Sequence, residues 1–378
     1  MIYFDNSATT KIYPESLDSY VSVSQNYFGN PSSLHELGTV TSQLLEHSRK
    51  QIANELRVKP NEIYFTSGGS EGDNWVIKGT ALEKSFYGKH IITTKIEHPA
   101  VLNTMSQLEK EGFEVTYLSV DSNGVIDLEE LKAILRKDTI LVSIIAVNNE
   151  IGTIQPLEEI GQILQKYPTV HFHIDAVQAH YIDLNLGRDS RIDMAVFSSH
   201  KFHGPRGVGF VYIKEGKNIT PLIHGGGQEQ TLRSGTENLP AIAAMAKSYR
   251  LHQEKAKQLD LDQLTNKIRN YIKKFEDIVI FSPENGSPHV LCFGIKNVRG
   301  EVTVHAFEKY DIFLSTTSAC SSKSSKDSST LTAMGIPHHV AETAVRVSLS
   351  TENTEAEVDT FLNAFDKIYK EFEIVRKS

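Results

Sequence analysis

The chain has 378 residues, of which 39% are hydrophobic and 23% are charged, and its net charge is −8. These figures are typical of a globular protein of about two domains, and they disfavour direct binding of nucleic acid, which selects basic surfaces. The longest apolar stretch, residues 140–147, is far shorter than the ~20 residues of a membrane helix. The N-terminus also lacks a basic start followed by an apolar run. We therefore expect a cytoplasmic protein that does not bind a membrane.

Strands and helices are predicted to alternate from residue 62 onward. Seven segments rich in Val, Ile and aromatic residues are expected to be strands: 62–67, 90–98, 113–120, 139–147, 170–177, 193–199 and 208–213. Four segments with Leu, Ile and Val at helical spacing are expected to be helices: 73–84, 100–111, 128–136 and 157–167. This alternation predicts an α/β fold with a seven-stranded, mostly parallel sheet covered by helices. The last strand is a candidate to run antiparallel.

The C-terminal third is predicted to form a smaller α+β domain. A long amphipathic helical stretch, residues 241–275, is expected to connect it to the sheet. Strands are expected near 289–295, 312–315 and 345–349, and helices near 301–309 and 354–372. We place the large domain at residues 15–250. The smaller domain is then residues 1–14 plus 251–378.

The two cysteines, Cys292 and Cys320, do not have the spacing of a zinc site or a disulfide framework. Cys292 lies among apolar residues and is expected to be a small buried hydrophobe. Cys320 lies in a tract rich in serine and threonine, residues 316–330, that has no large apolar residue to anchor it. This loop is predicted to be mobile, and its thiol, near two lysines, is expected to be exposed and reactive.

Polar residues follow five of the predicted strands, at the sheet edge where ligands of open α/β proteins bind. The first strand leads into residues 66–72, whose small side chains open a helix and suit a phosphate, although a plain glycine turn fits them equally well. The other four strands are followed by His98, Asn149, Asp175 and Lys201. A phosphate cradle, an imidazole, an amide, a carboxylate and a lysine are thus predicted to share one edge.

A lysine at the end of a buried strand is desolvated, which lowers its pKa and makes it an amine nucleophile. For Lys201 the alternative is a surface lysine at the start of a loop, and for Asp175 it is a helix N-cap. His98, before a proline, has a structural alternative as well. Together these residues meet the needs of pyridoxal 5'-phosphate, which takes a lysine, an acid for its ring nitrogen and donors for its phosphate. His171 and His173 lack a third ligand nearby, so no metal is expected.

Longer motifs along nearly the whole chain resemble the cysteine desulfurases of the NifS/IscS type, in the class V aminotransferase family. These motifs are DNSATT (5–10), GNPSS (29–33), FTSGGSE (65–71), EHPA (97–100), NNEIGTIQP (148–156), DAVQ (175–178), SSHK (198–201), GGGQEQTLRSGTEN (225–238), SPH (287–289), SAC (318–320) and RVSL (346–349). The polar tract after Cys320 is similar to that of the family's long-loop group.

The resemblance implies fold type I of the pyridoxal-phosphate-dependent transferases and a homodimer. It also implies conversion of L-cysteine to L-alanine, with the sulfur left as a persulfide on Cys320. The sulfur would serve iron–sulfur cluster assembly or tRNA thiolation. The acceptor protein would be an iron–sulfur scaffold or a tRNA 4-thiouridylation sulfurtransferase.

The same resemblance implies a role for each matching residue. The catalytic residues would be Lys201, which would hold the cofactor covalently, Cys320 as second nucleophile, and His98, which would stack on the cofactor and move protons. The cofactor-binding residues would be Gly69, Ser70, Asn149, Asp175, Gln178, Ser198, His200, Lys201 and, from a second subunit, Thr236. Of these, Asn149 and Gln178 would contact the ring hydroxyl side of the cofactor. Asn149 and Arg346 would bind the substrate, since a guanidinium pairs well with a carboxylate.

Some residues depart from the family pattern, and some alternatives stay open. Thr317 stands where glycine is usual, which would stiffen the loop's hinge, Gly69 stands where alanine is common, and Ser350 stands where glycine often follows RVSL. A generic aminotransferase or lyase would have no use for Cys320. Selenocysteine lyase activity is possible on the same scaffold. An interaction platform with weak catalysis is disfavoured by the intact catalytic set. The acceptor and the rate without a partner stay undetermined.

Overall fold

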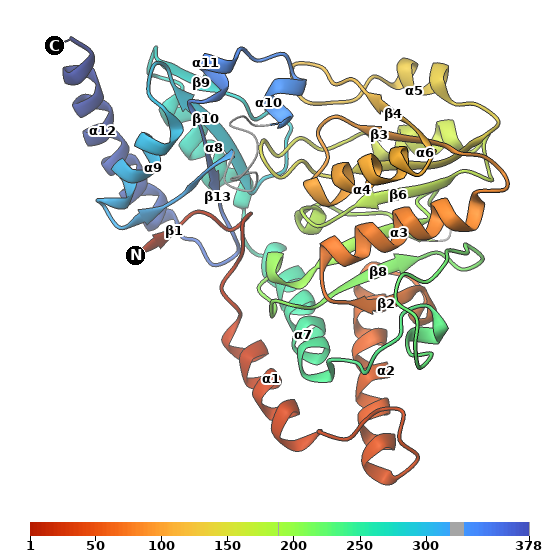
Figure 1. The fold of residues 1–378 in the computed structure, drawn as a ribbon. Coiled ribbons are helices and arrows are strands. Elements are labelled where there is room, and N and C mark those ends of the chain that lie inside the picture. Colours follow the sequence, from red (N-terminus) through yellow and green to blue (C-terminus); the bar gives the residue numbers. More distant parts are fainter. Residues whose placement is uncertain (188, 318–328, 378) are drawn as a thin grey trace.

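The computed structural model describes residues 1–187, 189–317 and 329–377 (Figure 1). A seven-stranded sheet forms its centre, with strand order β2-β8-β7-β6-β5-β3-β4. The strands are β2 (Ile63–Thr66), β3 (His90–Thr94), β4 (Glu114–Leu118), β5 (Thr139–Ile145), β6 (His171–Asp175), β7 (Met194–Ser198) and β8 (Gly209–Ile213). The pairs among β3 to β7 are parallel, and β8 runs antiparallel to β2 and β7. The predicted α/β sheet and its antiparallel last strand are confirmed.

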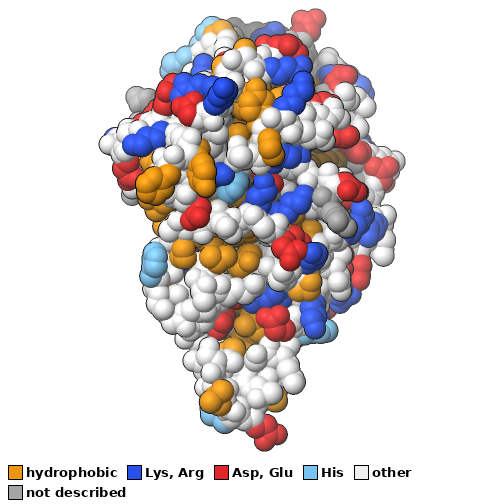
Figure 2. Space-filling model, turned by 90° about the vertical axis from the view of Figure 1, so that its right-hand side faces the viewer, with side chains coloured by type: hydrophobic (Ala, Val, Ile, Leu, Met, Phe, Trp, Pro, Cys, Tyr) orange, Lys and Arg blue, Asp and Glu red, His pale blue; other side chains and the backbone are white. Residues whose placement is uncertain are grey.

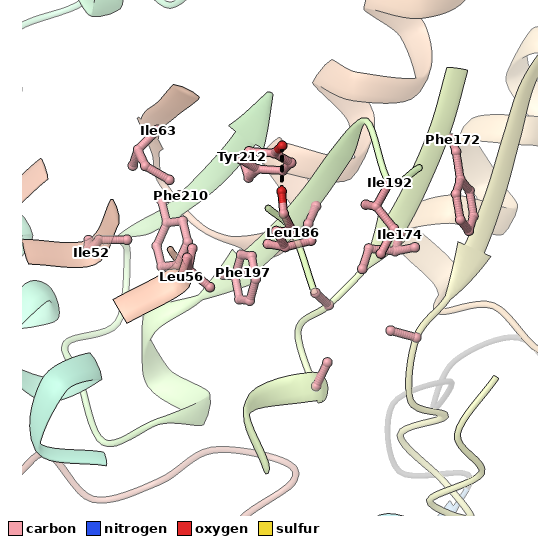
Figure 3. Packing of buried hydrophobic residues seen from close by; sticks show 14 of the residues in the cluster. Ile52, Leu56, Ile63, Phe172, Ile174, Leu186, Ile192, Phe197, Phe210 and Tyr212 are labelled. Atoms are coloured by element: carbon pink, nitrogen blue, oxygen red, sulfur yellow. Dashed lines mark hydrogen bonds between the residues drawn. The ribbon is translucent and has the colours of Figure 1, made fainter. Parts of the chain in front are cut away.

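Helices cover both faces of this sheet, because its central strands are apolar on both sides. On one face lie α3 (Gly69–Lys84) and α4 (Pro99–Lys110), whose buried side chains pack with those of β3, β5, β7 and β8. On the other face lie α2 (Glu36–Leu56), α6 (Leu157–Leu164) and α7 (Leu239–Ala256). Figure 3 shows part of this second layer, where Phe197 and Phe210 lie beside Ile52 and Leu56 of α2, and Phe172 and Ile174 lie farther along the sheet, near Ile192. A further helix, α5 (Leu128–Ile134), follows β4.

Two N-terminal helices were not predicted. They are α1 (Pro14–Asn26) and α2, and they project from the body in Figure 1. Only Ser16 and Val23 of α1 are buried, so this helix has little of the apolar periodicity from which helices are predicted. A proline at its first turn and His35, which caps α2 through a bond from Gly38 N at 3.2 Å, mark the helix starts instead.

The predicted helical stretch at residues 241–275 is two helices, which corrects the expectation of one connector. The first, α7, ends at Ala256, and α8 (Leu261–Ile272) begins after Asp260. The Asp260 carboxylate accepts a hydrogen bond from Gln263 N at 2.9 Å, which caps the new helix. The amphipathic pattern continues across the break, so the break was visible only as an aspartate three residues before a glutamine.

The C-terminal part has its own antiparallel sheet with the order β12-β13-β10-β9. The strands are β9 (Ile278–Ile280), β10 (Val290–Ile295), β12 (Ser315–Thr316) and β13 (Ala344–Ser348), and β1 (Ile2–Tyr3) pairs separately with β11 (Ile312–Phe313). The helices are α8, α9 (Gly300–Glu308), α10 (Ser329–Ala333), α11 (His338–Ala341) and α12 (Glu355–Lys377). Phe4 packs in the core of this part, among aromatic residues of β10, α9 and α12. The two-domain division, with its boundary at residue 250, stays a prediction.

Cys292 lies on β10 and is fully buried, as expected, and burial raises the pKa of its thiol. Cys320 and most of the predicted loop at 316–330 fall outside the described residues. No helix within the described residues is long and apolar enough to cross a membrane.

Candidate active site

A pocket of about 270 Å³ lies at the carboxyl ends of β5, β6 and β7. Ten of the twelve predicted site residues line it: Gly69, Ser70, His98, Asn149, Asp175, Gln178, Ser198, His200, Lys201 and Arg346. The structure does not bring Thr236 into this pocket; its side chain is exposed on the loop before α7. Cys320 lies outside the described residues. A larger cavity of about 470 Å³, lined by parts of 154–165 and 182–192, contains none of the predicted residues.

Lys201 ends a short 3-10 helix, η3 (Ser199–Lys201), that directly follows β7. Its Nζ donates hydrogen bonds to the carbonyl oxygens of Ser7 at 2.6 Å and Ala8 at 3.0 Å. Both carbonyls belong to the N-terminal motif at residues 5–10, which crosses the edge of the sheet. The amine is therefore held at the pocket wall, and Lys201 is not a solvated loop lysine.

The start of α3 provides a cradle for an anion. The first turn of a helix has N–H groups without partners inside the helix, and Gly68 contributes no side-chain cap. Gly68 has φ of 150°, which only glycine adopts readily. The hydroxyls of Ser70 and Ser198 and the imidazole of His200 border the same space. Free N–H groups, hydroxyls and the positive helix end together suit a phosphate.

Gly69 stands where the resemblance leads us to expect alanine, and its surroundings leave little room for a methyl group. A Cβ at residue 69 would lie 2.8 Å from Val177 Cγ2 and 3.6 Å from Ser198 Cβ. Val177 also lines the pocket, directly after Asp175 and Ala176. The valine therefore occupies the space that an alanine methyl would need.

His98 and Asp175 both line the pocket, and the charge of each affects the pKa of the other. His98 caps α4, with Nδ1 accepting a hydrogen bond from Ala100 N at 3.1 Å, so its proton is on Nε2. Burial lowers the pKa of His98, although Asp175 opposes this shift. Burial raises the pKa of Asp175, opposed by His98, a bond from Val177 N at 2.9 Å and Lys201. A cationic ring nitrogen next to Asp175 would favour its carboxylate form.

Arg346 reaches the pocket from β13 of the four-stranded sheet. Its guanidinium donates to Asn149 O at 2.7 Å and, through one nitrogen, to Asp5 Oδ1 and Ser315 Oγ at 3.0 Å each. Ser315 in turn donates to Asp5 Oδ1 at 2.7 Å. The buried Nε of Arg346 has no hydrogen-bond partner among the described residues. This fixed, buried cation suits a ligand carboxylate.

Four further residues in or next to the site were not assigned by the sequence: Ser7 and Asp73, which line the pocket, Asp5, which accepts from Arg346, and Glu97, which precedes His98. Three of them lie in motifs quoted above, which was the only signal. Asp73 lies one helical turn after Gly69, so it shares that residue's helix face. Its Oδ1 has no hydrogen-bond partner within the described part of the chain and lies 3.5 Å from His173 Nε2. Burial raises the pKa of Glu97 to about 8, although Thr94 Oγ1 and Ile145 N donate to it.

The histidines considered for a metal have other partners. His171 Nδ1 lies 3.3 Å from Thr80 Oγ1, and His173 Nδ1 lies 2.9 Å from Ser143 Oγ. Burial lowers the pKa of each to about 3. The residues that the structure describes contain no group of three or more His, Cys, Asp or Glu suited to a metal.

The donor set fits pyridoxal 5'-phosphate. The lysine amine, the buried Asp175 and the helix-end cradle open on one pocket, and each offers the chemistry that one part of this cofactor requires. Ser7 Oγ is buried at the pocket without a hydrogen-bond partner among the described residues, which leaves a polar atom for a ligand to satisfy.

Comparisons with known proteins agree with this assignment. The model of the aminotransferase class-V family matches residues 2–361. A protein from Lactobacillus delbrueckii subsp. bulgaricus named "NifS/IcsS protein homolog" is 54% identical, over 98% of each chain. "Cysteine desulfurase IscS" from Clostridium botulinum is 42% identical, over 98% of this chain and 94% of that one. A solved "NIFS-LIKE PROTEIN" has a TM-score of 0.91 and 40% identity, with 99% of each chain covered. The chain therefore belongs to the pyridoxal-phosphate-dependent class-V aminotransferase family and, within it, to the NifS/IscS type.

Proposed function

We propose that this protein is a cysteine desulfurase that converts L-cysteine to L-alanine and retains the sulfur as a persulfide on Cys320. The observation that carries the proposal is the meeting of Lys201, Asp175, the α3 cradle and Arg346 in one pocket. Relatives that are 42% identical over nearly the whole chain bear the name cysteine desulfurase. A lysine and an acid alone would fit many pyridoxal-phosphate enzymes, and Cys320 narrows the reaction to desulfuration.

We propose that different pocket residues bind the cofactor, bind the substrate and transfer protons. Bound pyridoxal phosphate supplies an electron sink for bond cleavage next to the substrate's amino group. We assign the phosphate to the α3 cradle with Ser70, Ser198 and His200, and to Thr236 of a second subunit. We assign the ring nitrogen to Asp175.

Three side chains are proposed to act on the substrate. Arg346 binds its carboxylate, next to Asn149, as a charge-assisted pair. Lys201 Nζ, already directed into the pocket by the two carbonyls, takes the proton from the substrate's α-carbon. His98, neutral with its proton on Nε2, returns a proton to the product side.

Cys320 is proposed to act as a thiolate on the substrate's sulfur. A new S–S bond forms while the C–S bond breaks, and the electron pair stays with the carbon fragment, which is protonated and leaves as alanine. The persulfide is a reversible cap on the cysteine, so its outer sulfur can pass to a second thiol. We propose that the acceptor is an iron–sulfur scaffold or a tRNA 4-thiouridylation sulfurtransferase, in the cytoplasm.

Exposed apolar side chains support the proposed homodimer. Phe28 and Leu37, at 74% and 50% exposure, and the fully exposed Leu34 lie on the projecting α1–α2 part. Figure 2 shows hydrophobic side chains at this tip and further patches on the body. Large apolar groups gathered in this way are typical of surfaces that another chain covers. Thr236 is exposed and outside its own pocket, and we propose that it serves the pocket of the partner.

The experiment that tests the function is release of alanine from L-cysteine in the presence of a reductant. Wild type, Cys320→Ala and Cys292→Ala are compared after loading with cofactor. Cys292→Ala is the matched control, since it removes the other thiol, which is buried on β10. We expect alanine from wild type and Cys292→Ala and little from Cys320→Ala. Equal release by Cys320→Ala would remove Cys320 from the mechanism, and no release by any cofactor-loaded protein would make the substrate assignment wrong.

A further inference from the structure

A chain of hydrogen bonds leads from the segment before β10 to the lysine of the pocket. Ser287 Oγ and His289 Nδ1 are 2.7 Å apart, and His289 Nε2 and Gln178 Oε1 are 3.1 Å apart. Gln178 Nε2 donates to Ser7 O at 2.9 Å, and Lys201 Nζ donates to the same carbonyl at 2.6 Å. Ser287, His289 and Gln178 are all buried. Two of the four side chains, Gln178 and Lys201, line the pocket.

The Ser7 carbonyl, at one end of this series of hydrogen bonds, determines which atom donates in each of the others. The Ser7 carbonyl only accepts, so the Gln178 amide must point its nitrogen toward Ser7 and its oxygen toward His289. His289 Nε2 must then carry the proton that it donates to Gln178. With one proton on a neutral imidazole, Nδ1 must accept, so Ser287 Oγ donates to it.

The surroundings of His289 keep its ring neutral and in place. The rings of His180 and Tyr181 lie 5.1 and 4.7 Å from it, centre to centre. Burial, together with His252, Arg346 and Lys201, lowers the pKa of His289 to about 3. A neutral imidazole has a single N–H, so the donor to Gln178 depends on the tautomer that Ser287 maintains.

The amide of Gln178 has a second N–H beyond the one that Ser7 uses. Because Gln178 lines the pocket, this N–H is the donor that the residue can offer to a ligand. If the amide turned over, its oxygen would face the Ser7 carbonyl, and the pocket would lose that donor. A residue that holds the Gln178 amide oxygen away from the pocket therefore determines that an N–H donor, and not the oxygen, faces the ligand.

We propose that His289 is a positioning residue, which holds Gln178 so that an amide N–H, and not the amide oxygen, faces the ring oxygen of the cofactor. This inference rests on the cofactor of the proposed function and adds a residue for which the resemblance gave no role. Ser287 supports it by fixing the tautomer of His289. A donor on the ring oxygen stabilises that oxygen's anionic form and so sets the pH at which the bound cofactor's visible absorption changes.

The test compares His289→Asn with His289→Gln in the cofactor-loaded protein. An asparagine amide ends where Nδ1 was and does not reach Gln178, whereas a glutamine amide ends where Nε2 was and can still donate to it. We expect His289→Asn to raise the pH midpoint of the absorption change by about half a unit to one unit, from the value of one lost hydrogen bond. His289→Gln should keep a midpoint close to that of wild type.

His252→Asn is the control, because His252 is as buried as His289 but bonds to His180, at 3.1 Å, and not to Gln178. It should lower the melting temperature and leave the midpoint unchanged. A wild-type midpoint in His289→Asn, with only the melting temperature lowered, would overturn the proposal.

If His289→Asn does not fold, Ser287→Ala provides the test. It removes the donor that keeps the His289 proton on Nε2, so it should also raise the pH midpoint. An unmoved midpoint in Ser287→Ala would then overturn the proposal. Absence of alanine release by wild type, with the midpoint shift present, would refute the desulfurase function and leave this inference standing.

Discussion

At the scale of single residues, burial sets the protonation of the pocket. It raises the pKa of Asp73 and Asp175 in the pocket and of Glu97 next to it, and it lowers the pKa of His98 and His200. Three acids and two imidazoles are thus pushed toward their neutral forms. Neutral groups next to the fixed guanidinium of Arg346 leave the pocket suited to an anionic ligand.

We predict that Glu97→Gln removes a pH dependence from the stability of the fold. Glu97 has a folded pKa of about 8 against an ordinary value of 4.5, so the folded state binds its proton more tightly. The wild type should therefore lose stability as the pH rises from about 4.5 to about 8, by at most ~1.4 kcal/mol per pH unit. Glutamine does not titrate, so the variant should gain stability relative to wild type over this range.

Urea unfolding of the two proteins at several pH values between these limits measures the effect. Glu276→Gln, which changes an exposed carboxylate, is the control and should not alter the pH dependence. A constant difference between Glu97→Gln and wild type across the range would contradict the assignment.

At the scale of elements, a buried ion pair fastens α2 to the loop that carries Thr236. Arg49 of α2 donates to both oxygens of Glu229, at 2.8 and 2.9 Å, and to Ile63 O at 2.6 Å. Glu229, Gln230 and Thr231 all have positive φ, between 48° and 70°, which is unfavourable for residues other than glycine. The ion pair and a bond from Phe65 N to Glu229, at 2.8 Å, hold this strained turn in place.

We predict that Arg49→Met lowers the free energy of unfolding by ~3–5 kcal/mol, because it leaves the Glu229 carboxylate buried without its partner. Arg49→Met combined with Glu229→Gln should cost less than the sum of the single changes. Denaturant unfolding measures both. Arg250→Met, which breaks the exposed pair with Glu254, is the control and should cost a few tenths of a kcal/mol. A loss of unfolding free energy in Arg49→Met as small as that of the control would refute the stabilising role of the Arg49–Glu229 ion pair.

At the scale of the whole molecule, each pocket is proposed to need two chains. The loop with Thr236 is also bound to its own cradle, since Arg233 donates to Glu71 at 2.8 Å and Glu71 accepts from Ser67 N at 2.8 Å. This loop is bonded to α3 of its own chain but leaves Thr236 exposed, so the Thr236 hydroxyl can reach a neighbouring subunit.

We predict that two inactive variants restore activity when their chains are mixed. Lys201→Ala lacks the amine, and Thr236→Asp places a negative charge against the partner's phosphate. A mixed dimer has one pocket with both residues intact, so random mixing should recover about a quarter of wild-type activity. Alanine release after co-expression measures this. Recovery no greater than the average of the separate variants would show that Thr236 acts within its own chain.

The sequence alone determined the sheet and most of the pocket. Parallel strands share their carboxyl edge, so local patterns that identify β5, β6 and β7 also bring Asn149, Asp175 and Lys201 together. Gly69 and Ser70 follow from the same rule, because α3 begins directly after β2. Motif resemblance added Arg346, which no local pattern would have joined to that edge, and it assigned a role to Gln178, which follows Asp175 by three residues.

The tertiary structure alone decided which distant segments complete the site. Lys201 meets Ser7 across 194 residues, Arg346 meets Asp5 across 341, and His289 meets Gln178 across 111. The apolar periodicity of a segment predicts which of its faces is buried, but it does not predict which distant segment packs against that face. The N-terminal motif at residues 5–10 and the segment before β10 reach the pocket only because Phe4 and the C-terminal sheet pack together, so their roles could be assigned only from the folded chain.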